Sequence, residues 1–243
     1  MSGGSDVRAE FAGPAENLAF DEALLREAPA APLLWLWRNP VCVVVGRGQK
    51  IAREVRVADC LRDGVPVLRR ASGGGTVFHD PGNLNVTLVL PGPADRPMEM
   101  LGRLMTGVVE WLGLLPRLGD RGVFVGEAKL CGFAVFRTKE GLLAHSTLLV
   151  DTDAARVGAY LTGPPPDPKP LDSHRSKVAS LADHGVRLPH GQVETVVRTV
   201  AAELLGPLTP RPPTSAELAR HRTLLSTRYH HPPWHSDGRQ LGP

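Results

Sequence analysis

Residues 69–90, RRASGGGTVFHDPGNLNVTLVL, place two arginines, a serine, three glycines and a His-Asp pair within strand-like sequence. Because glycine has no Cβ, a ligand can approach its main chain closely, and successive backbone amides could converge on one anion. An arginine beside the glycines could add a charge-assisted contact, and the serine a hydroxyl. The candidate residues are Arg69 or Arg70, Ser72, Gly73, Gly74 and Gly75.

The polar residues after the glycines help to decide between a structural turn and a binding site. A glycine-rich β-bulge needs no hydrogen-bonding side chains around it, yet His79, Asp80, Asn83 and Asn85 follow at once. The spacing matches neither the GxxxxGK[ST] loop nor the GxGxxG turn of nucleotide-binding βαβ units. We therefore predict a site for a phosphate or carboxylate outside a βαβ fold.

Hydrophobic periodicity indicates the first elements that would position these residues. The apolar positions of residues 15–28, AENLAFDEALLREA, recur at helical spacing. The runs LLWLWR and VCVVVGR flank Asn39-Pro40, a turn signal, and are predicted to be paired strands. Residues 51–64, IAREVRVADCLRDG, are predicted to form a second helix that ends at Gly64.

The remaining pattern favours an α+β fold with a mixed, mainly antiparallel sheet flanked by helices. The segment TGPPPDPKPLD is too rich in proline for regular structure and predicts a loop over a surface. Further strands are predicted at VPVLRR, TVFH, NLNVTLVL, GVFV, AKLCGFAVFR and GLLAHSTLLV, and further helices at PMEMLGRLMTGVVEWLGLL, DTDAARVGAYL, VETVVRTVAAELL and TSAELARHRTLL.

Composition bounds the class of protein. With 243 residues, 42% of them hydrophobic, the chain can bury a sizeable core. The net charge of +3 is spread along the chain without a basic run, which disfavours nucleic acid as a partner. Cys42, Cys60 and Cys131 lie too far apart for a disulfide framework or a zinc site, and no metal-ligand cluster is visible. No apolar run approaches the ~20 residues of a membrane span, so we expect a soluble, cytoplasmic protein that does not bind a membrane.

Together these motifs resemble the signature of the lipoate-protein ligase A family. That signature has an arginine pair, a serine, three glycines, an aromatic residue, His-Asp and Gly-Asn, all present in residues 69–83. The resemblance extends from about Ala15 to Trp234. Its other segments are ENLAFDEALL, VVVGRGQK, KLCGFA, LLAHSTLLV, SKVASL and TRYHHPPW.

The resemblance implies a catalytic domain like those of class II biotin and lipoate ligases, acting on ATP, Mg²⁺ and lipoate or octanoate. A carboxylic acid attacks the α-phosphate of ATP, and the resulting acyl-adenylate passes its acyl group to a lysine of an acceptor domain. Lys129 would contact the phosphate and the acyl carbonyl as a cation, and Arg70 would orient the acyl or phosphate end. The further binding residues implied are Ser72, Gly73, Gly74, Gly75, His79, Asn83, Gly132, His145 and Thr147.

Several alternatives stay open at the level of sequence. Octanoyltransferases of a related branch carry the acyl group on a cysteine, and Cys131 shares a predicted strand face with Lys129. A buried apolar thiol is the simpler interpretation of Cys131, and a structural role is the simpler one for His145. A third alternative is a protein without catalysis that binds lipoate or the adenylate.

The resemblance also implies partners and domain limits. The acceptors would be lipoyl domains of 2-oxoacid dehydrogenase E2 subunits or the glycine cleavage H protein. We expect an N-terminal tail at residues 1–14, a catalytic domain at 15–235 and a C-terminal tail at 236–243. Ligases of this family carry an accessory C-terminal domain after the catalytic domain, so a separate accessory subunit is a possible further partner.

Overall fold

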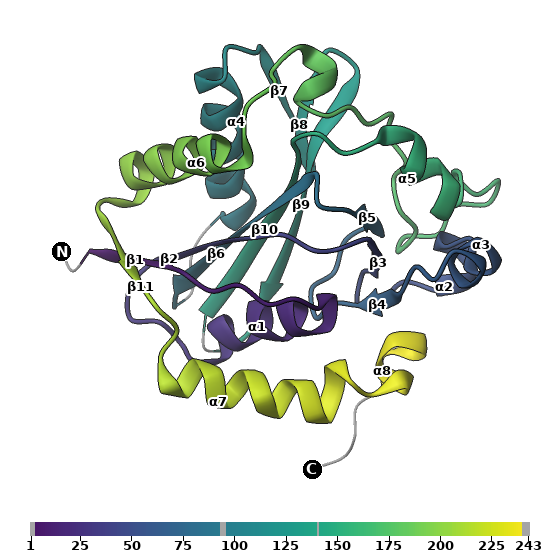
Figure 1. Cartoon of the computed structure of the whole chain (residues 1–243), viewed down its shortest axis with the longest axis horizontal. Helices are drawn as coiled ribbons and strands as arrows, with labels where there is room; N and C mark the ends of the chain where they lie inside the picture. Colours follow the sequence, from purple (N-terminus) through teal and green to yellow (C-terminus); the bar gives the residue numbers. More distant parts are fainter. Residues whose placement is uncertain (1–2, 93–95, 140, 240–243) are drawn as a thin grey trace.

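The computed structural model describes residues 3–92, 96–139 and 141–239. It contains an eight-stranded sheet and a three-stranded sheet with helices packed around them (Figure 1), which confirms the α+β class. The strands are β1 (Gly4–Val7), β2 (Leu33–Trp37), β3 (Cys42–Val45), β4 (Val67–Arg69), β5 (Val77–His79), β6 (Asn83–Pro91), β7 (Pro116–Gly119), β8 (Gly122–Val125), β9 (Ala128–Arg137), β10 (Gly141–Leu149) and β11 (Leu208–Arg211). The α-helices are α1 (Pro14–Arg26), α2 (Ile51–Glu54), α3 (Val57–Arg62), α4 (Pro97–Trp111), α5 (Ala154–Tyr160), α6 (His190–Leu205), α7 (Ser215–Leu224) and α8 (Pro232–Asp237).

The large sheet has the strand order β11-β1-β2-β6-β10-β9-β8-β7. Strand β1 runs parallel to both neighbours, and the strands from β2 to β7 pair antiparallel. Because β1 occupies residues 4–7, part of the expected N-terminal tail belongs to the sheet. Helix α8 likewise includes residues 236–237 of the expected C-terminal tail, while residues 1–2 and 240–243 lie outside the described residues.

The small sheet has the order β4-β3-β5 and corrects one prediction. Strands β2 and β3 were expected to pair, but β2 pairs with β1 and β6, and β3 pairs with β4 and β5. All residues of both strands are buried, so each needs cover on both faces and a neighbour on both edges. The turn at Asn39-Pro40 therefore carries the chain from one sheet to the other.

The predicted helix over residues 51–64 was also wrong in one respect, because it is broken into α2 and α3. Val55 adopts extended backbone, with φ −126° and ψ 135°, and forms a β-bridge with Leu161. A β-branched residue suits this conformation, and the bridge joins α2 to the segment that follows α5. Gly64 ends the second helix as expected, with a φ of +67°.

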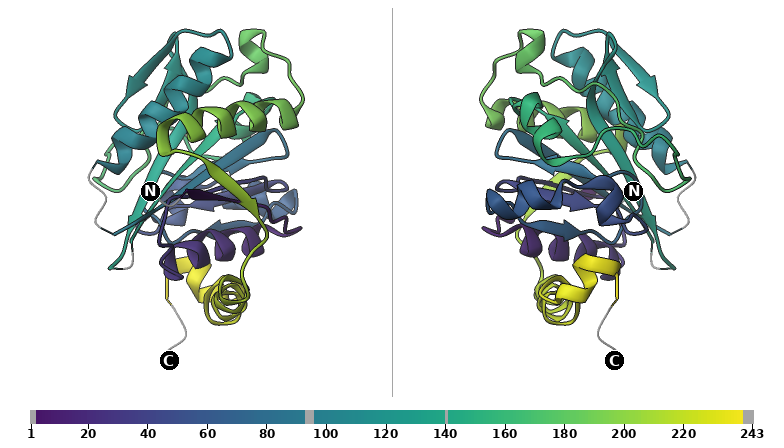
Figure 2. Two further views of the ribbon diagram at one scale, coloured as in Figure 1. Left: turned by 90° about the vertical axis from the view of Figure 1, so that its left-hand side faces the viewer. Right: turned by 90° about the vertical axis from the view of Figure 1, so that its right-hand side faces the viewer.

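Helices lie on both sides of the large sheet (Figure 2), and an apolar cluster packs on each of its faces. Alternate residues of β6, such as Leu84 and Val86, pack against α4 and α6. Helices α1 and α7 cover the opposite face together with the small sheet. On that second face β6 carries polar residues, including the buried Asn85 and Thr87, and Thr87 donates to Asp21 of α1. None of the helices in the described ranges is long and apolar enough to cross a membrane.

Candidate functional site

A cavity of about 560 Å³ opens between the small sheet and strands β8 to β10. A volume of this size fits a small-molecule ligand. Its lining combines apolar side chains, such as Val77 and Phe133, with polar and cationic ones. The polar and cationic lining residues include Arg70, Thr76, His79, Asn85, Arg117, Asp120, Arg121, Lys129, His145, Thr147, Ser173, His174 and Arg175.

Lys129 stands in this lining at the start of β9, half-buried. Its Nζ lies 5.7 Å from the centroid of the Phe124 ring, and within the described residues it makes no hydrogen bond or ion pair. A side chain at Gly122 would come within 2.5 Å of its Cε, so the absence of a Cβ there leaves room for the lysine. Burial lowers the pKa of Lys129, and the nearby Arg121 lowers it further. An anionic ligand would supply the missing partner for this ammonium.

Arg70 shapes the glycine turn, residues 73–75, from inside the cavity wall. Its Nη2 donates to the carbonyl oxygens of Gly73 (2.5 Å) and Gly75 (2.8 Å), and its Nε donates to Ser72 Oγ (2.8 Å). Gly74 has a φ of +84°, in the left-handed region that favours glycine. Across the described residues no hydrogen bond is donated by the three glycine amides, so they remain available. Of the three glycines, Gly75 borders the cavity.

Arg69, the other candidate arginine, points away from the cavity. Its guanidinium donates to carbonyls of Gly46 (3.0 Å), Arg47 (3.1 Å) and Gln49 (2.8 Å). It also donates to the carbonyls of residues 234–236 in α8. Of the two arginines, Arg70 borders the cavity, and Arg69 fastens α8 to the rest of the fold.

His145 has two partners that sequence reasoning missed. Its Nε2 lies 2.7 Å from Ser72 Oγ, and its Nδ1 lies 2.9 Å from Asp21 Oδ2. Asp21 comes from α1, so the contact depends on a fold that the linear sequence does not display. The order Ser-His-Asp resembles a hydrolase triad, but Ser72 is 2% exposed and lies outside the cavity lining. The arrangement holds His145 in the wall instead of presenting a nucleophile.

His79 is buried in the wall between two polar partners. Its Nδ1 lies 2.9 Å from Asn39 Nδ2, and its Nε2 lies 3.2 Å from Thr147 Oγ1. Burial, helped by the charges of Arg70 and His145, lowers the pKa of His79 to about 3. The imidazole is therefore neutral at physiological pH.

This neutral histidine predicts a stability that falls in mild acid. In the unfolded chain His79 binds a proton near pH 6.5, whereas in the folded chain it does so near pH 3. Between these values the unfolded state holds more protons, so the free energy of unfolding decreases as pH falls, by up to about 1.4 kcal/mol per pH unit. Urea unfolding from pH 7 to pH 4 should show a smaller slope for His79→Gln. The same change at the exposed His230 should leave the slope intact; equal slopes in all three proteins would contradict the prediction.

Cys131 is buried among apolar side chains of β9 and α4. Burial raises the pKa of its thiol to about 11. The thiol is therefore protonated at neutral pH, and a thiol is a much weaker nucleophile than a thiolate. Cys131 also borders the cavity, but its burial and its protonated thiol disfavour it as an acyl carrier.

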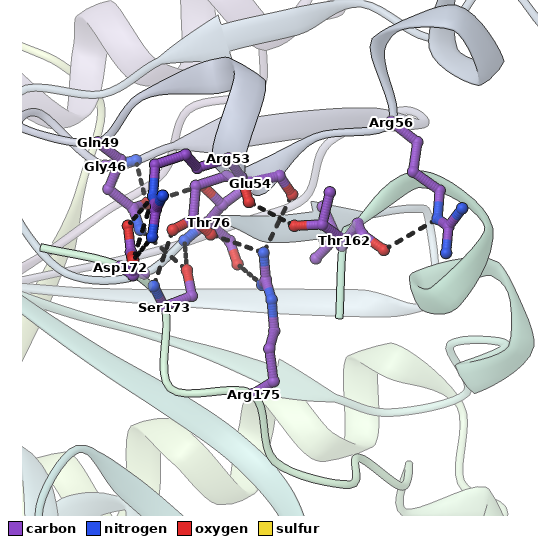
Figure 3. Close-up of polar contacts among 12 residues, drawn as sticks. Gly46, Gln49, Arg53, Glu54, Arg56, Thr76, Thr162, Asp172, Ser173 and Arg175 are labelled. Carbon is purple, nitrogen blue, oxygen red and sulfur yellow. Dashed lines mark hydrogen bonds and ion pairs between the residues drawn. The ribbon is translucent and has the colours of Figure 1, made fainter. Parts of the chain in front are cut away.

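A strap, residues 162–178, follows α5; its residues 173–176 and 178 border the cavity, and Figure 3 shows its polar contacts with Arg53 and Glu54 of α2. It contains the proline-rich segment that was predicted to be a loop over a surface. Arg53 of α2 pairs with Asp172 of the strap at 2.6 Å, and Glu54 pairs with Arg175 at 2.6 Å. These ion pairs join the strap to the small-sheet side of the cavity.

The strap also contacts the residues beside the glycine turn and the start of β9. Ser173 Oγ accepts hydrogen bonds from Thr76 N (2.8 Å) and Gln49 Nε2 (2.9 Å). On the other side, Lys129 N donates to Lys177 O at 2.7 Å. The strap therefore bridges the two walls that carry Lys129 and the glycine turn.

The structure brings together most of the residues that the sequence singled out. Asn83 is an exception, because it is fully buried and donates to Asp80 O and Oδ1 away from the cavity. Ser72, Gly73 and Gly74 do not border the cavity; Ser72 is buried behind the lining, whereas Gly73 is exposed. The predicted residues in the lining are Arg70, Gly75, His79, Lys129, Gly132, His145 and Thr147. Among the described residues, no group of three or more His, Cys, Asp or Glu side chains could hold a metal ion.

Comparison with known proteins places this architecture among ligases. The model of the lipoyl protein ligase A/B catalytic domain matches residues 13–204. A protein of Aeropyrum pernix, provisionally named a lipoate-protein ligase A, is 39% identical over 149 residues, which are 59% of this chain and 56% of that protein. The chain thus spans little more than half the length of this relative.

Solved structures share the whole fold. A bi-partite lipoate protein ligase of Thermoplasma acidophilum, studied with its E2 lipoyl domain, has a TM-score of 0.88 at 27% identity and covers 100% of this chain and 99% of its own. A lipoate-protein ligase A bound with ATP has a TM-score of 0.88 at 25% identity and covers 98% of this chain and 100% of its own. A T. acidophilum structure with bound lipoic acid, described provisionally as a lipoate protein ligase, has a TM-score of 0.86 at 25% identity and covers 97% of this chain and 100% of its own.

Proposed function

Because this chain belongs to the lipoyl protein ligase A/B catalytic-domain family, we propose that it transfers a lipoyl or octanoyl group through an acyl-adenylate to a lysine of an acceptor domain. The observation that carries the proposal is the Lys129 ammonium, which lies in the cavity without an anionic partner among the described residues. Relatives of similar fold bind ATP and lipoic acid. We propose that both ligands share this cavity.

The proposed roles follow from the chemistry of the two half-reactions. A carboxylate oxygen attacks the α-phosphorus of ATP and pyrophosphate leaves; the acceptor amine then attacks the acyl carbon and AMP leaves. Lys129 stabilises the negative charge on phosphate and carbonyl in both steps. A nearby phosphate favours its charged form and so offsets the effect of burial on its pKa.

The other predicted residues would bind or position the intermediate. Arg70 holds the glycine turn and faces the acyl group, and the Gly75 amide donates to the anion. Gly132 lets the ligand lie close to β9. Ser72, Gly73, Gly74, His79, Asn83, His145 and Thr147 would support these contacts from the wall or from behind it.

Magnesium would accompany ATP. Since the described residues lack a cluster of three ligands, the nucleotide phosphates would supply most of its coordination, with Asp120 in the lining as a carboxylate ligand. When bound, the ion would neutralise phosphate charge.

The proposed partners are a lipoyl-acceptor domain and a separate accessory subunit. The T. acidophilum relative is bi-partite and was studied with its E2 lipoyl domain. We propose the same kind of acceptor here, an E2 lipoyl domain or a glycine cleavage H protein.

Two acyl sources test the proposal directly. ATP with lipoate, and then preformed lipoyl-AMP, would be given to the protein with an apo acceptor domain, and the lipoylated product measured by mass. If product forms from lipoyl-AMP but not from ATP with lipoate, the activation step needs an accessory subunit. Adding that subunit should then restore the reaction from ATP and lipoate. Binding of lipoyl-AMP without product from either source would contradict the transferase and favour the binding protein.

The competing octanoyltransferase mechanism makes a different prediction for Cys131→Ser. Because the thiol is buried and protonated, we expect this variant to keep wild-type transfer within about a factor of two, since the change is confined to one buried atom. Intact mass after incubation with octanoyl-acyl carrier protein should show no adduct. An acylated Cys131 that disappears in the variant together with activity would support the thioester route.

A further inference from the structure

Asn85 of β6 carries a donor that the fold leaves unused. The side chain is 2% exposed and lines the cavity, and its Nδ2 has no hydrogen-bond partner within the described residues. Buried amide groups are nearly always hydrogen-bonded, because a lost bond to water must be replaced. An acceptor atom of a ligand in the cavity would satisfy this unpaired donor.

The orientation of this amide is fixed by a chain of hydrogen bonds that begins at the backbone. Asn17 Nδ2 lies 3.3 Å from Phe11 O and 3.1 Å from Arg38 O, both of which are acceptors only, so this atom must be the nitrogen. Its third contact, at 2.9 Å, must then be the oxygen of the Asn39 amide. It follows that Asn39 turns its nitrogen toward His79.

The same logic continues through His79 to the cavity. Asn39 Nδ2 donates to His79 Nδ1, so the proton of the neutral ring is on Nε2 and is donated to Thr147 Oγ1. Thr147 then donates its own hydroxyl proton to Asn85 Oδ1 at 3.0 Å. Each step excludes the flipped amide at the next, so the unpaired atom of Asn85, in the wall of the cavity, is its Nδ2.

The position of this donor relative to Lys129 indicates which part of a ligand it would bind. Asn85 pairs with Thr147, and Thr147 pairs with Gly132, so the three residues form one row across β6, β10 and β9 on the same sheet face. The Cβ position of Gly132 lies 4.0 Å from Lys129 Nζ. The amide donor and the ammonium therefore lie along one row of the same sheet face, two strands apart, in the lining of one cavity.

We propose that Asn85 Nδ2 donates a hydrogen bond to the carbonyl oxygen of the acyl group, opposite Lys129, and so positions the acyl carbon of the adenylate. This inference rests on the proposed function. In a medium-chain acyl substrate the strong acceptors are at the carboxyl end, which is also the end that an ammonium binds. Asn85 is a positioning and specificity residue that selects ligands with a carbonyl at this point.

A matched pair of ligands tests the contact. Octanoyl-AMP contains the carbonyl, and octyl-AMP is the same phosphodiester without it. Calorimetry should show that the wild-type protein prefers octanoyl-AMP, and that Asn85→Leu reduces this preference by roughly ten- to a hundredfold. Octyl-AMP itself should bind both proteins with similar affinity.

Asn85→Asp keeps the acceptor for Thr147 and replaces only the donor. We expect it to lose the preference for octanoyl-AMP at least as strongly as Asn85→Leu, and also to lower the free energy of unfolding, because a carboxylate is costly to bury. A purely structural Asn85 would change stability and leave the ratio of the two affinities unchanged, which would overturn the inference. If the wild-type protein binds neither compound, the proposed function fails; if it binds both and the ratio survives in both variants, only the role of Asn85 fails.

Discussion

Replacing Lys129 with alanine should lower acyl transfer from lipoyl-AMP by about a hundred- to a thousandfold, the typical effect of removing one electrostatic contact to a transition state. The reason is geometric. Its ammonium lies in the cavity beside Gly132 and has no competing partner among the described residues. Product formation is measured by intact mass of the acceptor domain in single-turnover reactions.

Two further variants separate charge from packing at this position. Lys129→Met keeps most of the aliphatic stem and loses the charge, so it should be as inactive as the alanine variant. Lys139→Ala removes an exposed lysine beyond the end of the same strand and should retain activity. Because burial already lowers the pKa of Lys129, its removal should not reduce the urea midpoint. Full transfer by Lys129→Met would exclude the proposed role.

Replacing Arg69 with leucine should destabilise the protein by about 3–5 kcal/mol, at the upper end of single-residue effects. The guanidinium is 2% exposed and donates to six carbonyl groups from two separate segments. Leucine would leave these carbonyls without their donor. Urea unfolding followed by tryptophan fluorescence measures the loss.

Two further substitutions test whether the charge of Arg69 or the geometry of its guanidinium stabilises the fold. Arg69→Lys keeps the charge but cannot reach both segments, so it should recover only a small part of the stability. Arg222→Leu on the exposed face of α7 should be nearly neutral. In Arg69→Leu, limited proteolysis should cleave first near α8, because the carbonyls of residues 234–236 lose the guanidinium that holds them. Unchanged stability would mean that α8 is held by other contacts.

The sequence predicted those parts of the site that depend on local pattern. The glycine turn needs one residue with left-handed backbone and one position where a neighbouring side chain leaves no room for a Cβ. Only glycine permits both, so the three glycines alone predicted a turn at Gly74 and Gly75. Strands β6, β9 and β10 could be found because their apolar residues alternate or run together.

What sequence could not predict were the contacts between distant segments. The Asp21 partner of His145 is on α1, 124 positions away, and no periodicity links the two. The pairing of β2 was predicted wrongly because a short connection suggests a hairpin, whereas burial on both faces placed β2 and β3 in different sheets. The role of Asn85 depends on the relay through His79, which only the three-dimensional arrangement displays.

The elements after residue 204 have a practical consequence for anyone who trims this protein to the segment that the family model matches. Leu224, Tyr229 and Trp234 complete the apolar layer beneath α1, and Arg228 pairs with the buried Glu22. A shortened recombinant fragment would expose this apolar surface of α1, together with the Glu22 carboxylate, to solvent. We expect this fragment to aggregate on expression, so a lack of activity in it would not bear on the chemistry of the intact polypeptide.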